Sequence, residues 1–256
     1  FFSLFYIKLV TLRFTQTLSF KLSSGVIFLH RYSKNFILNK VGNLRGDSEI
    51  IHHGLNIKTS KTKYKCKKYR LIYVSNIDFY KNQIFILKGI DSLILKYPYL
   101  KNLLKVEFYG SSYKPALKKF NNYLYKNIKN KKNFRYFGLR NSKTIYRDQK
   151  NFDTIFLFAS SCENFSVSLI EGMSRGYAIL CVNLQPMKSV LGNSALFYKH
   201  NSIGSFQKQL KKIISFKNLQ NNISKKVYKR SKNFSDKRIA KKNYKFLIKI
   251  LKKYEK

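Results

Sequence analysis

The 256-residue sequence predicts an α/β fold: a Rossmann-like, doubly wound parallel sheet, preceded by a smaller N-terminal region. Two observations support this fold class. From about Tyr69 to Phe216, short apolar runs alternate regularly with segments of helical spacing. Two of the runs, at residues 154–161 and 178–183, carry no charge, which is typical of strands buried on both faces. Such alternation favours a parallel sheet joined by crossover helices.

The predicted strands share an apolar core, and several end in glycine or serine. They are LIYVS (71–75), KVEFYG (105–110), NFRYFG (133–138), TIFLFASS (154–161), AILCVN (178–183) and ALFY (195–198). Helices are expected between and after them, over residues 82–97, 114–128, 142–150, 167–175 and 203–216 and along the basic C-terminal stretch. Gly176 is the expected stop of the helix over 167–175. Ligands bind such sheets outside the carboxyl ends of the strands.

The N-terminal region begins with the apolar stretch FFSLFYIKLVTLRFTQTLSF. Lys8 and Arg13 interrupt it, so its apolar run is too short to span a bilayer. We expect an amphipathic helix, and we favour packing in a core over lying on a membrane surface. A strand (25–30), a helix (31–41) and a strand (49–56) are expected next.

The formal net charge is +41, from 52 Lys and Arg against 11 Asp and Glu. Such a field attracts nucleic acid, anionic lipid or phosphorylated ligands. Lys, Asn, Ile, Phe and Tyr all have A- and T-rich codons, so a biased genome also explains the lysines, and we favour that cause. The three cysteines, Cys66, Cys162 and Cys181, form neither a disulfide framework nor a zinc spacing, which predicts a reducing, cytoplasmic setting.

Glu163 and Glu171 are the only acidic residues between Asp153 and Asp236. They flank the expected start of a helix, where Ser166 is a candidate N-cap. Free N–H groups at a helix N-terminus bind phosphate, and carboxylates accept hydrogen bonds from sugar hydroxyls. Together these groups suit a nucleotide-sugar. Equally open, on the residues alone, is that Glu171 stabilises the helix through its dipole and that Glu163 is solvated.

The segment SSCENFSVSLIEGMSRGYAILCVNLQPMKSVLGNSALFY resembles group 1 glycosyltransferases, the retaining, family 4-like enzymes with the GT-B fold. Glu163 and Glu171 match the two glutamates of the E-x7-E hallmark of that family, and Met173 and Gly176 match its later M and G. LIYVSNIDFYKNQ is similar to its first strand and phosphate-binding segment, with Lys81 at the lysine position. GVIFLHRYSKNFI and IIHHGLN resemble the end of its acceptor half and the interdomain crossover.

The resemblance implies two catalytic roles. Glu163 contacts the donor sugar hydroxyls near the reacting centre, and Lys81 neutralises the departing diphosphate. Glu171 holds the ribose hydroxyls. The full expected donor-binding set is Asn76, Gly110, Asn164, Phe165, Ser166, Ser168, Leu169 and Glu171. No cofactor and no metal are expected, because the chain has no DxD motif and helix N–H groups with Lys81 can replace an ion.

The sequence also departs from the family pattern. Asn76 stands where the family usually has arginine, which removes one cation from the diphosphate site. Asn164 and Ser166 replace glycines, and Ser189 replaces a glutamate. The acceptor half is nearly absent, and the chain starts at Phe1 without methionine, so we expect a fragment.

The implied domains are residues 1–57, a remnant of the acceptor domain and crossover; 58–68, a basic linker; 69–218, the nucleotide-sugar-binding domain; and 219–256, a basic helical segment. His30, His52 and His53 are interpreted as structural or crossover residues rather than catalysts.

The implied function is transfer of a sugar from a nucleotide-sugar to a lipid-linked or polysaccharide acceptor, with retention, as in cell-surface polysaccharide biosynthesis. The expected location is the cytoplasm, with peripheral contact to the anionic inner face of the membrane. One alternative is a truncated domain that binds donor without turnover. A nucleic-acid-binding protein is disfavoured, because the lysines are spread over all helices and the aromatic residues lie within apolar strands.

Overall fold

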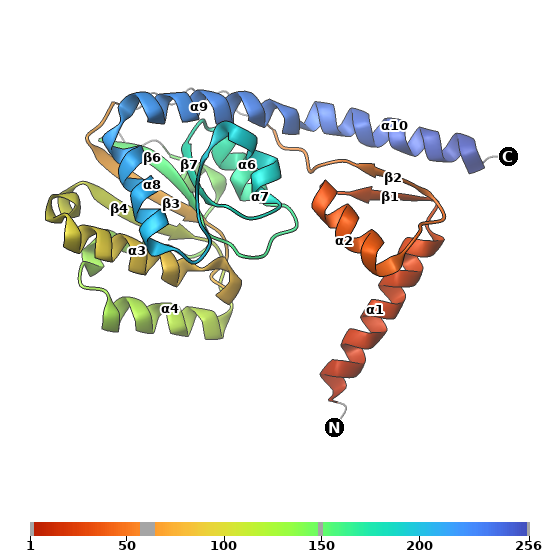
Figure 1. Cartoon of the computed structure of the whole chain (residues 1–256), viewed down its shortest axis with the longest axis horizontal. Coiled ribbons are helices and arrows are strands. Elements are labelled where there is room, and N and C mark those ends of the chain that lie inside the picture. Colours follow the sequence, from red (N-terminus) through yellow and green to blue (C-terminus); the bar gives the residue numbers. More distant parts are fainter. Residues whose placement is uncertain (1–2, 57–64, 148–150, 255–256) are drawn as a thin grey trace. The chain divides into compact units, whose positions relative to one another are not determined.

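The computed structural model describes residues 3–56, 65–147 and 151–254 (Figure 1). The chain forms two compact units, a smaller one of residues 1–56 with 234–256 and a larger one of residues 57–233. The expected C-terminal segment 219–256 is therefore divided between the units. Most of the expected linker lies outside the described residues, and its last residue, Lys68, begins the first strand of the larger unit.

The larger unit is built on a six-stranded sheet with the order β5-β4-β3-β6-β7-β8, in which every neighbouring pair is parallel. This confirms the predicted doubly wound fold, and each predicted strand is present. The bounds are β3 Lys68–Val74, β4 Leu104–Tyr109, β5 Phe134–Tyr136, β6 Phe152–Phe158, β7 Ala178–Val182 and β8 Leu196–Tyr198.

Helices cover both faces of this sheet because the chain adds strands in two opposite directions. From β3 it proceeds to β4 and β5 at one edge, and from β6 to β7 and β8 at the other. Right-handed crossovers then place the helices of the two halves on opposite faces. In Figure 1, α3, α4 and α8 lie on one side of the sheet and α6 and α9 on the other. The bounds are α3 Gln83–Lys96, α4 Lys114–Asn127, α5 Ser142–Ile145, α6 Val167–Ser174, α7 Met187–Leu191, α8 Ile203–Ser215 and α9 Lys217–Ser231. Short 3₁₀ helices span Phe79–Lys81, Pro98–Asn102, Lys131–Asn133, Gly192–Ser194 and Lys232–Phe234.

Helix α6 packs directly on the central strand β6. A side chain at Gly172 would place its Cβ 2.7 Å from the ring of Phe156, so glycine is required for this close approach. Leu169 and Met173 are buried on the same helix. Gly176, at φ +67°, follows the helix, and the Tyr177 N–H reaches the Gly172 carbonyl, as predicted for a glycine stop. Tight packing fixes where the first turn of α6 stands at the sheet edge.

The smaller unit combines both ends of the chain. Strands β1 (Gly25–Phe28) and β2 (Asp47–Ile50) form a parallel pair, with α2 (Arg31–Val41) between them. The C-terminal helix α10 (Asp236–Tyr254) packs against them through Ile239 and Phe246, which form a small core with Ile51. Asp47 pairs with Lys249 and Lys253 of α10 at 2.9 and 3.0 Å.

Helix α1 (Leu4–Leu22) forms as expected and is capped by Ser3, but the favoured interpretation of it as a core helix is wrong. None of its residues is buried, and Leu4 and Phe5 are 88% and 68% exposed. Its apolar residues lie on all sides of the helix rather than on one face, and near its C-terminus Phe20 stacks on Phe28 at 6.1 Å. Over the described residues, none of the helices combines the length and apolar character that crossing a membrane requires.

Candidate functional site

The candidate site lies at the carboxyl edge of the sheet, where β3 and β6 are neighbours and the strand order reverses. Doubly wound sheets bind ligands at this switch point. Two loops meet there: residues 75–82 after β3, which include the 3₁₀ helix Phe79–Lys81, and residues 159–166 after β6. The structure thereby brings together the predicted lysine and the predicted glutamate loop.

Lys81 ends the 3₁₀ helix between β3 and α3, and several contacts fix its position. The residue is only 8% exposed. Asp78 caps its 3₁₀ helix by accepting a hydrogen bond from the Phe79 N–H at 2.7 Å. The buried Tyr73 hydroxyl donates to the Lys81 carbonyl at 2.7 Å. Burial raises the pKa of Tyr73 well above its usual value, so the phenol stays a donor. The Lys81 ammonium also lies 4.9 Å from the centre of the Tyr80 ring.

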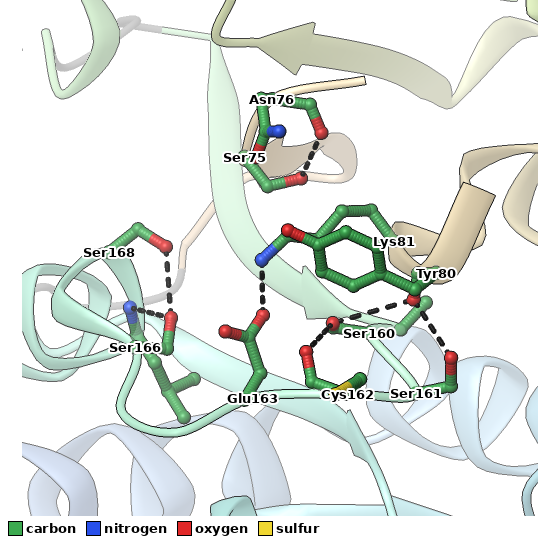
Figure 2. A network of polar contacts seen from close by, with 12 residues as sticks. Ser75, Asn76, Tyr80, Lys81, Ser160, Ser161, Cys162, Glu163, Ser166 and Ser168 are labelled. Carbon is green, nitrogen blue, oxygen red and sulfur yellow. Dashed lines mark hydrogen bonds and ion pairs between the residues drawn. The ribbon is translucent and has the colours of Figure 1, made fainter. Parts of the chain in front are cut away.

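Lys81 and Glu163 form an ion pair, with Nζ 2.5 Å from Oε1 (Figure 2). The side chains are 11% and 10% exposed, so most of the water around both charges has been removed. Each charge offsets the desolvation cost of the other, and removing one partner would leave an uncompensated charge. The two residues predicted to be catalytic are thus in contact.

The loop after β6 is tied to the 3₁₀ helix through backbone groups (Figure 2). The Tyr80 carbonyl accepts hydrogen bonds from the Ser161 N–H at 2.8 Å and the Ser161 hydroxyl at 3.0 Å. The Asn82 amide donates to the Ala159 carbonyl at 3.0 Å. These contacts set the position of Glu163 relative to Lys81. They could not be predicted from the sequence, since a backbone acceptor leaves no pattern in the side chains.

The N-terminus of α6 faces this loop. Ser166 is its N-cap, as predicted, and accepts a hydrogen bond from the Leu169 N–H at 3.3 Å. Its oxygen also lies 3.2 Å from the Ser168 hydroxyl. Because the cap already engages Leu169, the N–H groups of Val167 and Ser168 are the ones that a phosphate would meet first.

Glu171 is the fifth residue of α6 and is partly buried. Its Oε2 accepts a hydrogen bond from the Tyr146 hydroxyl at 2.8 Å. Burial, followed by the nearby Glu171 carboxylate, raises the pKa of Tyr146 well above its usual value. The phenol is therefore neutral and donates. Tyr146 is a second contact that the sequence analysis missed.

The remaining predicted donor-binding residues lie in the loops around this edge. Asn76 is partly buried after β3, and its carbonyl accepts a hydrogen bond from the buried Gln83 amide at 2.8 Å. Gly110, at φ +138°, directly follows β4; a Cβ there would lie 2.3 Å from the Ser75 carbonyl oxygen. Asn164 is exposed and Phe165 partly buried. Their roles toward a donor stay predictions.

The described residues contain no group of three or more His, Cys, Asp and Glu side chains placed to hold a metal ion. The Lys81 ammonium and the N–H groups of the first turn of α6 suit an anion, whereas the partly buried carboxylate of Glu171 suits hydroxyl groups. One edge therefore combines the elements required by a phosphate and by a sugar.

Residues 56–230 match a family model described as glycosyl transferases group 1. The chain belongs to the group 1 glycosyl transferases. This confirms the resemblance, and the match covers the whole sheet with its helices. A search of curated protein sequences found no match.

Solved glycosyltransferase structures share the fold of this group 1 glycosyl transferase. One of them is TarM of S. aureus, with a TM-score of 0.74 and 16% sequence identity. The match covers 91% of this chain and 45% of TarM. HepE of Anabaena, solved with UDP and glucose, has a TM-score of 0.78 at 13% sequence identity. The match covers 94% of this chain and 67% of HepE. Sucrose-phosphate synthase of Thermosynechococcus elongatus has a TM-score of 0.77 at 13% sequence identity. The match covers 94% of this chain and 62% of the synthase. The chain spans less than half of TarM, and identities this low establish the fold alone.

Proposed function

We propose that the chain is a retaining, family 4-like glycosyltransferase that moves a sugar from a nucleotide-sugar donor to a lipid-linked or polysaccharide acceptor. The observation that carries this proposal is the buried Lys81–Glu163 pair beside the N-terminus of α6. A cation and free helix N–H groups at a Rossmann-like switch point suit a diphosphate, and the carboxylates suit the two sugar rings.

In the proposed mechanism the diphosphate binds between Lys81 and the first turn of α6. Negative charge develops on the diphosphate as the bond to the sugar breaks. Lys81 and the N–H groups of Val167 and Ser168 stabilise that charge without reorganising, because packing already fixes them. Glu163 accepts hydrogen bonds from the transferred sugar, and Glu171 from the ribose. Asn76, Asn164 and Phe165 line the donor. No metal or other cofactor is required in this account.

The related structures support a uridine diphosphate donor. HepE was solved with UDP-glucose, and the pneumococcal O-GlcNAc transferase GtfA with UDP and GlcNAc. A TarM variant was solved with UDP and α-GlcNAc-glycerol, which supports a glycan acceptor. Those ligands belong to those proteins, and the extension to this chain is part of the proposal.

We place the reaction at the cytoplasmic face of a membrane. Cys66, Cys162 and Cys181 all lie in the described part of the chain and none of them forms a disulfide, which suits a reducing compartment. The net charge of +41 favours an anionic lipid surface, and the exposed apolar residues of α1 would contact lipid. The proposed role is polysaccharide or lipopolysaccharide assembly.

The test is direct assay of transfer. The purified chain is mixed with UDP-glucose, UDP-GlcNAc or GDP-mannose and with glycan or lipid-linked acceptors, and proton NMR reports the anomeric configuration of the product. An α-linked product from an α-linked donor is expected. A β-linked product would contradict retention. Donor binding without any transfer would favour the alternative of a donor-binding domain.

A further inference from the structure

Tyr146 has no role in the proposed mechanism, yet it contacts Glu171, the proposed ribose-binding group. Its hydroxyl donates to Glu171 Oε2 at 2.8 Å, and the residue is only 4% exposed. Hydrogen bonds to an ionised acceptor are stronger than neutral ones, particularly where water is excluded. The hydrogen bond from Tyr146 therefore restricts the orientation of the Glu171 carboxylate.

The ring of Tyr146 is itself fixed on several sides. The Arg175 guanidinium lies 5.3 Å from the ring centre, and the Tyr177 ring lies 6.3 Å away. The Tyr177 hydroxyl reaches the Tyr146 carbonyl at 3.4 Å. A side chain packed in this way has little freedom to turn its hydroxyl away from Glu171.

A buried charge network holds the backbone that carries Tyr146. Arg70, 1% exposed, donates to the Ile145 carbonyl at 2.7 Å. The same guanidinium pairs with Glu107 at 2.5 Å and donates to the Tyr109 hydroxyl at 3.0 Å. These residues belong to β3 and β4, so the central strands set the position of the turn after α5. The path runs from the sheet through Tyr146 to Glu171.

We propose that Tyr146 is a positioning residue that orients the Glu171 carboxylate toward the donor ribose, so that the site selects ribonucleotide over deoxyribonucleotide donors. This inference rests on the proposed function. With Oε2 engaged by Tyr146, the carboxylate presents its other oxygen, Oε1, to the 2′- and 3′-hydroxyls. A fixed acceptor binds a diol without first losing rotamer freedom. A donor that lacks these hydroxyls leaves the carboxylate without that partner.

The test compares UDP with 2′,3′-dideoxy-UDP by calorimetry. The wild type is expected to bind UDP more tightly. Tyr146→Phe is expected to weaken UDP binding about tenfold and to leave dideoxy-UDP binding nearly unchanged, so the ratio of the two affinities falls. In the Glu171→Gln background, adding Tyr146→Phe is expected to change the ratio no further, because the tyrosine acts through the carboxylate.

Tyr69→Phe is the matched control. Tyr69 is equally buried at 4%, and its hydroxyl donates to the Ile214 carbonyl at 2.8 Å, at the other end of β3. It should lose stability without changing the affinity ratio. If Tyr146→Phe does not fold, Tyr146→Met removes the same hydroxyl from a side chain that adapts to its surroundings.

The outcomes separate the inference from the proposed function. A wild type that binds no nucleoside diphosphate would overturn both. A wild type that prefers UDP, together with an unchanged preference in Tyr146→Phe, would overturn the inference and leave the proposed function standing. An equal loss of affinity for UDP and dideoxy-UDP would also overturn it, since that pattern indicates a purely structural role.

Discussion

Lys81 and Glu163 lie 82 positions apart in the sequence and 2.5 Å apart in the structure. Both are about nine-tenths buried, so their contact stabilises two charges that water no longer solvates. A diphosphate approaching Lys81 would bring a second, stronger anion to the same ammonium. In the proposed mechanism Glu163 therefore holds the Lys81 ammonium in place before the donor binds. Once the donor is bound, the ammonium interacts with both Glu163 and the diphosphate.

Replacing Lys81 tests its assignment to the diphosphate. Lys81→Met is expected to weaken UDP binding about tenfold to a hundredfold, because a charge-assisted hydrogen bond is lost. Binding of uridine, which has no phosphate, should change little. Calorimetric titration with UDP, UMP and uridine gives the comparison.

The matched control is Lys88→Met. Lys88 lies in α3 over the Tyr123 ring, at 5.1 Å, so this variant removes the same charge and a cation–π contact away from Glu163. Its UDP affinity should match that of the wild type. Equal losses for UDP and uridine in Lys81→Met would contradict the assignment.

The charged residues of the candidate site could be predicted from the sequence, but the residues that form hydrogen bonds to their side chains or backbone could not. Glu163 and Glu171 were predicted from their match to the E-x7-E spacing, and Lys81 from the similarity of LIYVSNIDFYKNQ to the phosphate-binding segment of the family. Tyr73 and Tyr146 were not predicted, because their hydroxyls reach a backbone carbonyl and a carboxylate through tertiary contacts. One tyrosine among 19 carries no signal of its own.

Among the elements, α6 matters most, because its first turn supplies the proposed phosphate contacts. Its placement depends on the Ser166 cap at one end and on the close approach of Gly172 to Phe156 along its side. Both features are readable in part from sequence: serine before an apolar run predicts a cap, and glycine within a helix points to close packing.

Removing the cap tests the contribution of the helix terminus. Ser166→Ala is expected to destabilise the fold by about 1 kcal/mol and to weaken UDP binding, since the first turn frays without its cap. Ser202→Ala is the control, because Ser202 caps α8 by accepting a hydrogen bond from the Ser205 N–H at 3.3 Å.

Thermal unfolding and UDP titration are measured on both cap variants. Similar losses of stability are expected, with reduced UDP affinity in Ser166→Ala alone. Reduced affinity in both variants would show that the effect follows general stability rather than the α6 terminus.

Helix α1 shows where an element can be predicted and its surroundings cannot. The apolar composition and the length predicted a helix, and Leu4–Leu22 forms one. The expected amphipathic character and the favoured packing in a core were wrong, because apolar residues lie on all sides of this helix and do not indicate which face another element covers. Period and composition determine the element; burial depends on the rest of the molecule.

On the scale of the whole molecule, the doubly wound sheet was predicted from alternation alone, and its strand order β5-β4-β3-β6-β7-β8 places the reversal beside the candidate site. The division into units was less accessible. The C-terminal helix α10 belongs with residues 1–56 through Ile239 and Phe246, and a contact between the two ends of a chain has no local signature.

Buried phenols and a buried thiol give the larger unit a defined response to alkaline pH. Burial raises the pKa values of Tyr73, Tyr146, Tyr198 and Cys181 above their usual values. Below about pH 8 both the folded and unfolded forms keep these protons, so the contribution of these groups to the free energy of unfolding is fully present. Above the ordinary values of 9.0 for cysteine and 10.0 for tyrosine, the unfolded chain loses protons that the folded chain retains.

The free energy of unfolding should therefore fall as pH rises from about 9 to 11, at up to about 1.4 kcal/mol per pH unit for each group. Urea unfolding at a series of pH values measures this slope. Tyr198→Phe should make the fall shallower, because one titrating group has gone. A free energy of unfolding that stays level through pH 11 would contradict the burial of these groups.

The central claim is that this sheet edge binds a nucleotide-sugar through Lys81, Glu163 and Glu171. Calorimetric titration of the purified chain with UDP, GDP and their sugar conjugates tests it most directly, repeated on Glu171→Ala. The account predicts saturable binding of at least one nucleoside diphosphate by the wild type, weakened about tenfold or more in the variant. Binding to none of these ligands, or equal binding by both proteins, would contradict it.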